Sequence, residues 1–130
     1  MKLILPQHIH KVGAGFPSPA TDYVEDDIDL NVHLIKNIPS TFLVRVQGKS
    51  MNKVGIHDGD LLIVDKSLNP KKFSTVIVNI NEELVVKTFI KENNQSFLTS
   101  GSKEIEDKIN LTENSEISIW GVVTYVIHAL

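Results

Sequence analysis

The stretch Gly48-Lys49-Ser50-Met51, followed after three residues by Gly55-Ile56-His57-Asp58-Gly59-Asp60-Leu61-Leu62-Ile63-Val64-Asp65, organises this chain. Before it, alternating apolar residues predict a strand over 42–47, and the apolar run at its end predicts another over 61–65. Ser50 therefore follows a strand end. Glycine has no Cβ, so a second backbone can approach closely beside Gly48. Such a serine can be presented to a peptide bond, although an ordinary loop serine that satisfies a turn amide fits these residues as well.

Lys87 is the charge that stands inside the apolar run Leu84-Val85-Val86-Lys87-Thr88-Phe89-Ile90, which predicts a strand. Long lysine side chains often lie along apolar surface with the ammonium in water. A buried lysine, in contrast, loses its charge more easily, because burial disfavours the charged form. A neutral amine can take the proton of a serine hydroxyl, which makes Ser50 and Lys87 a candidate nucleophile and base.

These segments carry a resemblance to a known family, the self-cleaving peptidases of the LexA and UmuD type. Its catalytic motifs resemble Gly48-Lys49-Ser50-Met51, Asp58-Gly59-Asp60-Leu61-Leu62-Ile63-Val64-Asp65 and Val86-Lys87. Two further segments match, the closing Trp120-Gly121-Val122-Val123 and Ala14-Gly15-Phe16-Pro17-Ser18-Pro19-Ala20-Thr21-Asp22-Tyr23-Val24-Glu25. The resemblance covers nearly the whole chain and is most specific in the last of these segments.

The resemblance implies a Ser-Lys serine endopeptidase that cuts its own backbone. Ser50 is then the nucleophile, Lys87 the general base, and the bond between Ala14 and Gly15 the cleavage site. The backbone N–H groups of Ser50 and Met51 are expected to hold the oxyanion. No cofactor and no metal are expected. LexA-type repressors carry a DNA-binding domain before the cut site, whereas residues 1–14 are too few for one, so we expect no sequence-specific DNA binding.

The same resemblance implies a role in the SOS response to DNA damage. A RecA–single-stranded DNA filament would stimulate the cleavage, and the shortened product would join a UmuC-type subunit as the regulatory part of an error-prone translesion DNA polymerase. A homodimer is also implied. Two alternatives stay open: a non-catalytic module that regulates a polymerase, and a phage or mobile-element relative with the same chemistry and another polymerase partner.

Composition limits the classes of protein to which the chain can belong. Its 130 residues suit one core, and its net charge of −3 argues against broad binding to a phosphate backbone. The absence of cysteine excludes disulfides and thiolate metal sites and fits a reducing cytoplasm. No apolar run approaches the roughly 20 residues that span a bilayer. The apolar start, Met1 to Pro6, is too short for a signal peptide, so we expect a cytoplasmic protein with no membrane contact.

The pattern predicts a mostly β fold, an antiparallel sheet domain of the LexA and UmuD C-terminal type, preceded by an extended arm. Four prolines punctuate the arm, which we place at residues 1–40 and expect to be extended or irregular. A helical turn over 29–34, capped by Asp29, leads into the domain at 41–130. Further strands are expected at 75–80, 84–90, 96–99 and 117–127, with a hairpin at Asn81-Glu82, a loop over 100–116 and a short strand near 109–111.

The histidines offer two weaker hypotheses. His8 and His10 alternate as metal ligands can, but they have no nearby cysteine or carboxylate, so we expect no metal site there. His57 is close to Ser50 in sequence and could complete a Ser-His-Asp triad with Asp58 or Asp60. A triad is defined by geometry and not by proximity in sequence, so this hypothesis ranks below the lysine pair.

Overall fold

The computed structural model describes residues 4–8, 24–100, 108–112 and 116–130, with side chains described from Asp29 onward. It divides into two compact units, residues 1–36 and residues 37–130. Among the described residues, no helix combines the length and the apolar character that a membrane span requires.

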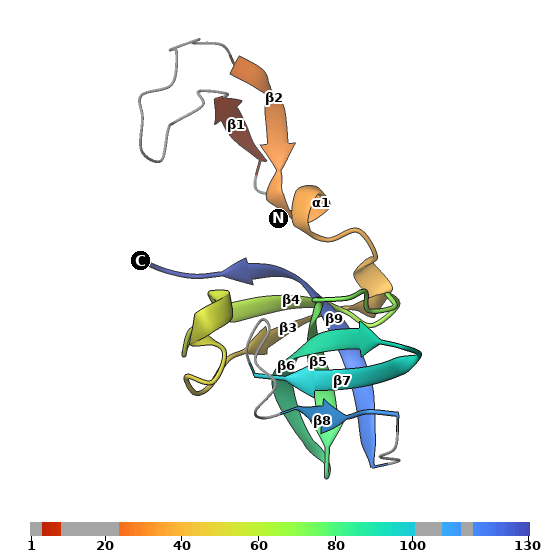
Figure 1. The fold of residues 1–130 in the computed structure, drawn as a ribbon. Coiled ribbons are helices and arrows are strands. Elements are labelled where there is room, and N and C mark those ends of the chain that lie inside the picture. The colour runs from red at the N-terminus through yellow and green to blue at the C-terminus, as the bar shows by residue number, and fades with distance from the viewer. Residues whose placement is uncertain (1–3, 9–23, 101–107, 113–115) are drawn as a thin grey trace. The chain divides into compact units, whose positions relative to one another are not determined.

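The first unit is a two-stranded antiparallel sheet followed by one helical turn (Figure 1). β1 (Ile4–His8) pairs with β2 (Val24–Asp29), and the register shifts between Leu5 and Gln7. Pro6 lies at this shift, where its missing N–H does not interrupt a regular ladder. α1 (Leu30–Leu34) begins where the Asp29 carboxylate accepts a hydrogen bond of 3.0 Å from the Asn31 N–H. The expected helical turn is confirmed, but the pairing of strands within the arm was not predicted.

The second unit is a seven-stranded antiparallel sheet in the order β3-β4-β9-β5-β6-β7-β8. Two 3-10 turns, η1 (Ile38–Ser40) and η2 (Asn52–Val54), lie on either side of β3 in the sequence. The mostly β, antiparallel fold is confirmed, and the strands begin and end within a few residues of the expected positions. They are β3 (Thr41–Arg45), β4 (Leu61–Asp65), β5 (Thr75–Ile80), β6 (Glu83–Glu92), β7 (Gln95–Thr99), β8 (Ile109–Asn110) and β9 (Ile117–Ile127).

β9 joins the two halves of this sheet, because its first part pairs with β5 and its second part pairs with β4. The exchange of partners occurs at Val122, which pairs with a residue of each neighbouring strand, and the ladders shift register on either side of it, at Trp120 with β5 and at Thr124 with β4. A Cβ at Gly121 would lie 2.5 Å from Cγ1 of the fully buried Val64. Glycine is therefore required at this position so that β9 can cross β4 at close range.

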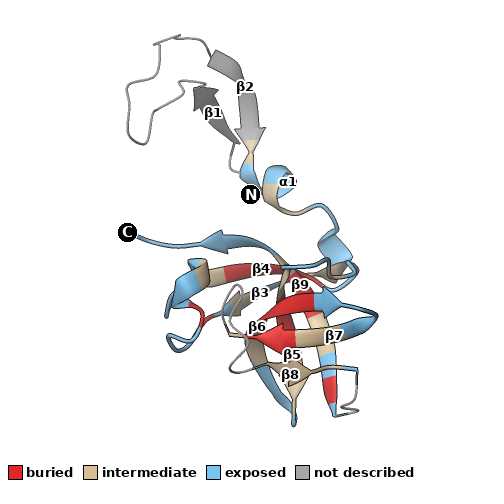
Figure 2. Ribbon diagram, in the orientation of Figure 1, coloured by how far each residue is buried: buried red, intermediate tan, exposed pale blue. Residues whose placement is uncertain are grey.

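The core forms two clusters of apolar side chains. Figure 2 marks buried residues in red, among them parts of β4, β6 and β7. The cluster nearer β3 contains Val46, Met51, Ile56, Leu62, Val64 and Ile77, and the other contains Val76, Val78, Phe89, Leu98, Ile117 and Val122. Met51 and Ile56 belong to the loop between β3 and β4 and not to a strand. Burial of these two side chains fixes the loop that carries Ser50 against the sheet.

Two tight turns connect β5, β6 and β7. Asn81 and Glu82 have φ angles of 51° and 69°, and Asn93 and Asn94 have φ angles of 46° and 64°. Two successive residues with positive φ form the turn that suits the twist of a hairpin, and asparagine tolerates this backbone well. The hairpin expected at Asn81-Glu82 is confirmed.

Candidate active site

Ser50 lies in a loop that is held from both sides. Its neighbour Met51 is 2% exposed, and the Met51 carbonyl accepts hydrogen bonds from the Val54 and Ile56 N–H groups at 3.1 and 3.2 Å. On the other side, Gly48 has a φ of 101°, a conformation that glycine adopts without strain. The Asp58 carboxylate accepts a 2.7 Å hydrogen bond from the Gly48 N–H. The serine is thus exposed on a loop whose two flanks are anchored.

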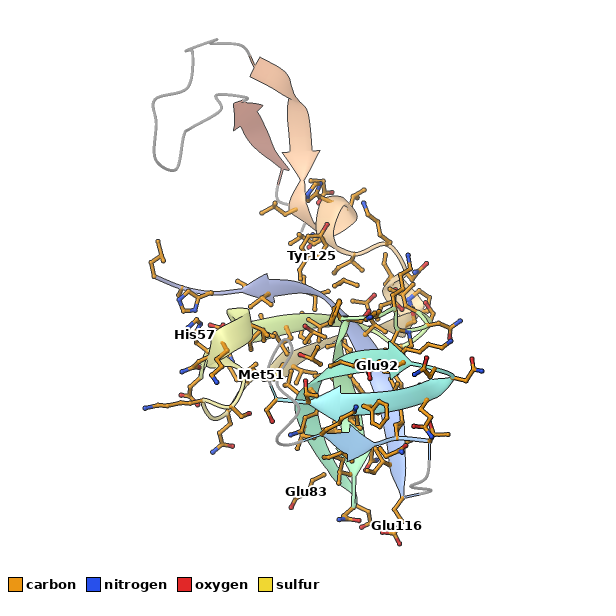
Figure 3. The ribbon with its side chains drawn as sticks, viewed as in Figure 1. Met51, His57, Glu83, Glu92, Glu116 and Tyr125 are labelled. Atoms are coloured by element: carbon orange, nitrogen blue, oxygen red, sulfur yellow. The ribbon has the colours of Figure 1, made fainter. Side chains whose placement is uncertain are left out.

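The Ser50 hydroxyl and the backbone N–H groups of Ser50 and Met51 are the groups of this loop that are expected to take part in the reaction. Within the described part of the chain, neither the Ser50 hydroxyl nor the N–H groups of Ser50 and Met51 donate a hydrogen bond to another residue. Two adjacent N–H groups without an internal acceptor can stabilise a negatively charged oxygen. Figure 3 shows Met51 and His57 near η2, at the same end of the second unit.

Lys87 lies in β6 and is half-buried. Its ammonium Nζ donates a 2.9 Å hydrogen bond to the Ser100 Oγ. The pair Thr88–Thr99 is the last in the β6–β7 ladder, and Lys87 and Ser100 stand opposite each other one step beyond it. The sequence analysis missed Ser100, because its position depends on the register of two strands and no local pattern shows it.

Ser50 and Lys87 line the same cavity, which has a volume of about 320 Å³. The end of β3 and the loop that follows it form one wall, and the start of β6 forms another. Aliphatic side chains make up much of the lining. The full set is Val44, Arg45, Val46, Gln47, Gly48, Ser50, Met51, Ile77, Leu84, Val85, Val86 and Lys87. The arrangement brings a hydroxyl and an amine from segments distant in sequence to one cavity with both polar and apolar walls.

The alternative triad gains less support from this geometry. His57 is not among the residues that line the cavity. Its Nδ1 lies 3.9 Å from the Asp60 carboxylate, whose nearer partner is the His128 Nδ1 at 2.5 Å. The carboxylate of Asp58 accepts the hydrogen bond from Gly48. The two aspartates of the proposed triad therefore hold the loop and the C-terminal segment.

Asp60 is a buried carboxylate that the sequence suggested as part of a turn or as a partner of His57 in a triad. It is 3% exposed, and its Oδ2 accepts a 2.8 Å hydrogen bond from the His57 N–H. The hydrogen bond with the His128 side chain, followed by the one from the His57 backbone, holds the pKa of Asp60 below its usual range. His128 was overlooked because it is 68 residues away in sequence.

Three of the expected positions lie outside what the structure describes. Ala14 and Gly15, the predicted cleavage site, fall within residues 9–23, as does His10. The backbone of His8 is part of β1, but its side chain is not described. The cleavage site at Ala14 and Gly15 therefore remains a prediction from the sequence, as does the expectation that His8 and His10 form no metal site.

Comparison with known proteins supplies the family. The peptidase S24-like family matches residues 6–124, which is most of the chain. The chain belongs to the peptidase S24-like family. Protein ImpA of Salmonella typhimurium is 41% identical over 125 residues, covering 96% of this chain and 84% of ImpA. Protein SamA of Salmonella typhimurium strain LT2 is 37% identical over 123 residues, covering 95% of this chain and 84% of SamA.

A LexA repressor belongs to the same set of relatives. The protein from Clostridium novyi strain NT is 32% identical over 111 residues, which cover 85% of this chain and 53% of the repressor. The resemblance to the LexA and UmuD type is thereby confirmed. Membership of the S24-like family supports a self-cleaving peptidase role for this chain.

Proposed function

We propose that this protein is a self-cleaving serine endopeptidase with a Ser50–Lys87 dyad. The observation that carries the proposal is the cavity that both side chains line. Aliphatic side chains of Val85 and Val86 stand beside Lys87 in the cavity wall, and an amine that has lost its proton can accept the one from Ser50. In the described structure Lys87 donates to Ser100, so the reaction requires the amine to turn from Ser100 toward Ser50.

The reaction has two stages. Ser50 Oγ attacks the carbonyl carbon of Ala14 while Lys87 takes the hydroxyl proton, and the N–H groups of Ser50 and Met51 stabilise the resulting oxyanion. The C–N bond to Gly15 then breaks, and the lysine returns the proton to the leaving amine. Water hydrolyses the acyl-enzyme and releases residues 1–14. The two loop N–H groups support this assignment, because they have no acceptor within the described residues.

The experiment follows the mass of the purified chain at rising pH, with and without a RecA–single-stranded DNA filament. We expect loss of residues 1–14 at high pH, because alkali favours proton removal from the attacking hydroxyl, and at neutral pH when the filament is present. Ser50→Ala and Lys87→Ala should each slow cleavage by a factor on the order of 10⁴ or more. His33→Ala is the matched control and should leave the rate largely unchanged, whereas His57→Ala tests the alternative of a histidine base.

Each other outcome has a defined meaning. A chain that stays intact in alkali and with the filament contradicts the peptidase assignment. Cleavage that survives Lys87→Ala but not His57→Ala would replace the dyad with a histidine base. Cleavage at another bond would leave the dyad in place and remove the assignment of Ala14 and Gly15.

We propose that the cleaved protein acts in the SOS response as the regulatory subunit of an error-prone translesion polymerase, in the cytoplasm, with a UmuC-type subunit as partner. A homodimer fits the surface of the second unit. Leu43 is 60% exposed, and Tyr125 and Ile127 are 38% and 46% exposed. The strand register places these three on one face of the β3-β4-β9 edge, where a second copy could cover them.

A non-catalytic regulatory module is the second candidate. The hydrogen bond between Lys87 and Ser100 favours it, because a lysine used only for structure would be held in this way. Co-purification with a UmuC-type subunit fits both candidates. Co-purification combined with an uncleaved chain under every condition above would favour the module.

A further inference from the structure

Three polar side chains converge at the end of the second unit where β4 begins and β9 ends. His57 lies in the loop after η2, Asp60 directly precedes β4, and His128 directly follows β9. Leu61 pairs with Ile127 in the β4–β9 ladder, so Asp60 and His128 stand opposite each other one step beyond it. One ligand atom from each of the three residues lies within 4.8 Å of the others.

These groups have the chemistry of a transition-metal site. Imidazole nitrogen and carboxylate oxygen are ligands that zinc prefers among protein side chains. The carboxylate of Asp60 is buried and oriented by the hydrogen bond from the His57 N–H. The side chains of His57 and His128 are 46% and 43% exposed, and their ring centroids are 5.1 Å apart. An ion can therefore approach from solvent and meet both imidazoles above a fixed carboxylate.

We propose that His57, Asp60 and His128 bind a divalent transition-metal ion, with zinc as the best fit. Ligand atoms around a tetrahedral zinc lie about 3.4 Å apart, given bonds of about 2.1 Å. The His57 Nδ1 is already 3.9 Å from the Asp60 carboxylate. The His128 Nδ1 is 2.5 Å from the Asp60 Oδ1, so binding requires this hydrogen bond to open and both exposed rings to rotate toward the ion. Three protein ligands leave a fourth position for water, which suggests an exchangeable ion.

The site lies beside the loop that carries Ser50. The Asp60 carbonyl accepts a 2.8 Å hydrogen bond from the Val46 N–H, and the Gly59 N–H donates to the Val46 carbonyl at 2.8 Å. Val46 and Gly48 both line the cavity. A bound ion would therefore tie the C-terminal segment to the base of this loop. This inference does not depend on the proposed peptidase reaction, because the three ligands exclude Ser50 and Lys87.

The test titrates zinc chloride into the full-length, tag-free chain by calorimetry, and cobalt chloride with visible absorption as the readout of coordination. The Ser50→Ala background keeps the chain uncleaved. His57→Gln and His128→Gln are the informative variants, since both side chains are partly exposed and their loss should not prevent folding. His33→Gln is the matched control. A His8→Gln, His10→Gln double variant tests whether the arm binds the metal.

We expect one zinc ion per chain, with affinity that falls on the order of 100-fold in His57→Gln and in His128→Gln. His33→Gln and the arm double variant should bind as the parent does. Cobalt bound to the parent should show the intense visible absorption of a four- or five-coordinate ion. This absorption should be absent when cobalt is added to either informative variant. Absence of binding in the parent would overturn the proposal, as would binding that survives His57→Gln and His128→Gln or vanishes in the arm variant.

Discussion

At the scale of single residues, Asp65 shows how one carboxylate organises several backbone segments. It is 3% exposed at the end of β4 and accepts hydrogen bonds from Asn37, Ser40 and Ser67. These bonds, the one from the Ser67 hydroxyl first, hold its pKa far below the usual range. The sequence analysis treated Asp65 only as the end of a strand, because its partners come from segments whose proximity the sequence does not reveal.

Asp65→Asn should lower the stability of the second unit, because an amide nitrogen replaces one of the two oxygens that accept these bonds. The folded-state pKa is lowered from an unfolded value near ~3.9, so the stabilisation is complete above that value and is lost as the pH falls through the folded pKa. Denaturant unfolding at pH 7 and at pH 3 measures both effects. The variant should unfold more easily at pH 7 and lose less stability on acidification.

Asp29→Asn is the control for this change. Asparagine caps a helix about as well as aspartate, so the same substitution at α1 should leave the unfolding of the second unit unchanged. If Asp65→Asn matched the parent at both pH values, the network around Asp65 would not contribute to stability.

At the scale of elements, the sequence predicted the strands well and their partners poorly. The alternation of apolar and polar residues and the runs of β-branched residues predicted the positions of β4, β5 and β9. The division of β9 between β4 and β5 depends on long-range register, with shifts at Trp120 and Thr124, which local pattern does not carry. The pairing of β1 with β2 was missed because its two strands are 15 residues apart and rich in polar residues. The sequence pattern and the family motifs predicted Ser50 and Lys87 as the site, whereas the positions of Ser100 and His128 depend on the ladders.

Glu82 occupies a turn position that its residue type disfavours. Its φ is 69°, and a left-handed backbone costs residues with a long side chain about 1 kcal/mol or more. Glu82→Gly should therefore raise the stability by about 0.5–1 kcal/mol, measured as a shift of the denaturant midpoint at constant slope. Glu83→Gly, one residue later within β6, should lower it by a similar amount because glycine weakens a strand. Equal effects of the two changes would contradict the strain at position 82.

At the scale of the whole molecule, the proposed cut divides the first unit and spares the second. β1 ends at His8 and β2 begins at Val24, so the bond between Ala14 and Gly15 lies in the connection between them. An isolated two-stranded sheet is marginally stable, and a cut connection removes the covalent link that favours its pairing. Both apolar clusters consist of residues after 37, so the core does not need the arm.

Complete cleavage should therefore release the segment 1–14 into solution while the rest of the chain remains folded. The thermal midpoint of the product should lie within about 4 °C of that of the uncleaved Ser50→Ala chain, which corresponds to less than about 1 kcal/mol for a domain of this size. Native mass spectrometry after cleavage measures the release, and circular dichroism on heating measures the midpoint. A segment that stays bound would show that β1 pairs without its connection. A much lower midpoint would show that the released segment stabilises the second unit, and the core described above would then be insufficient by itself.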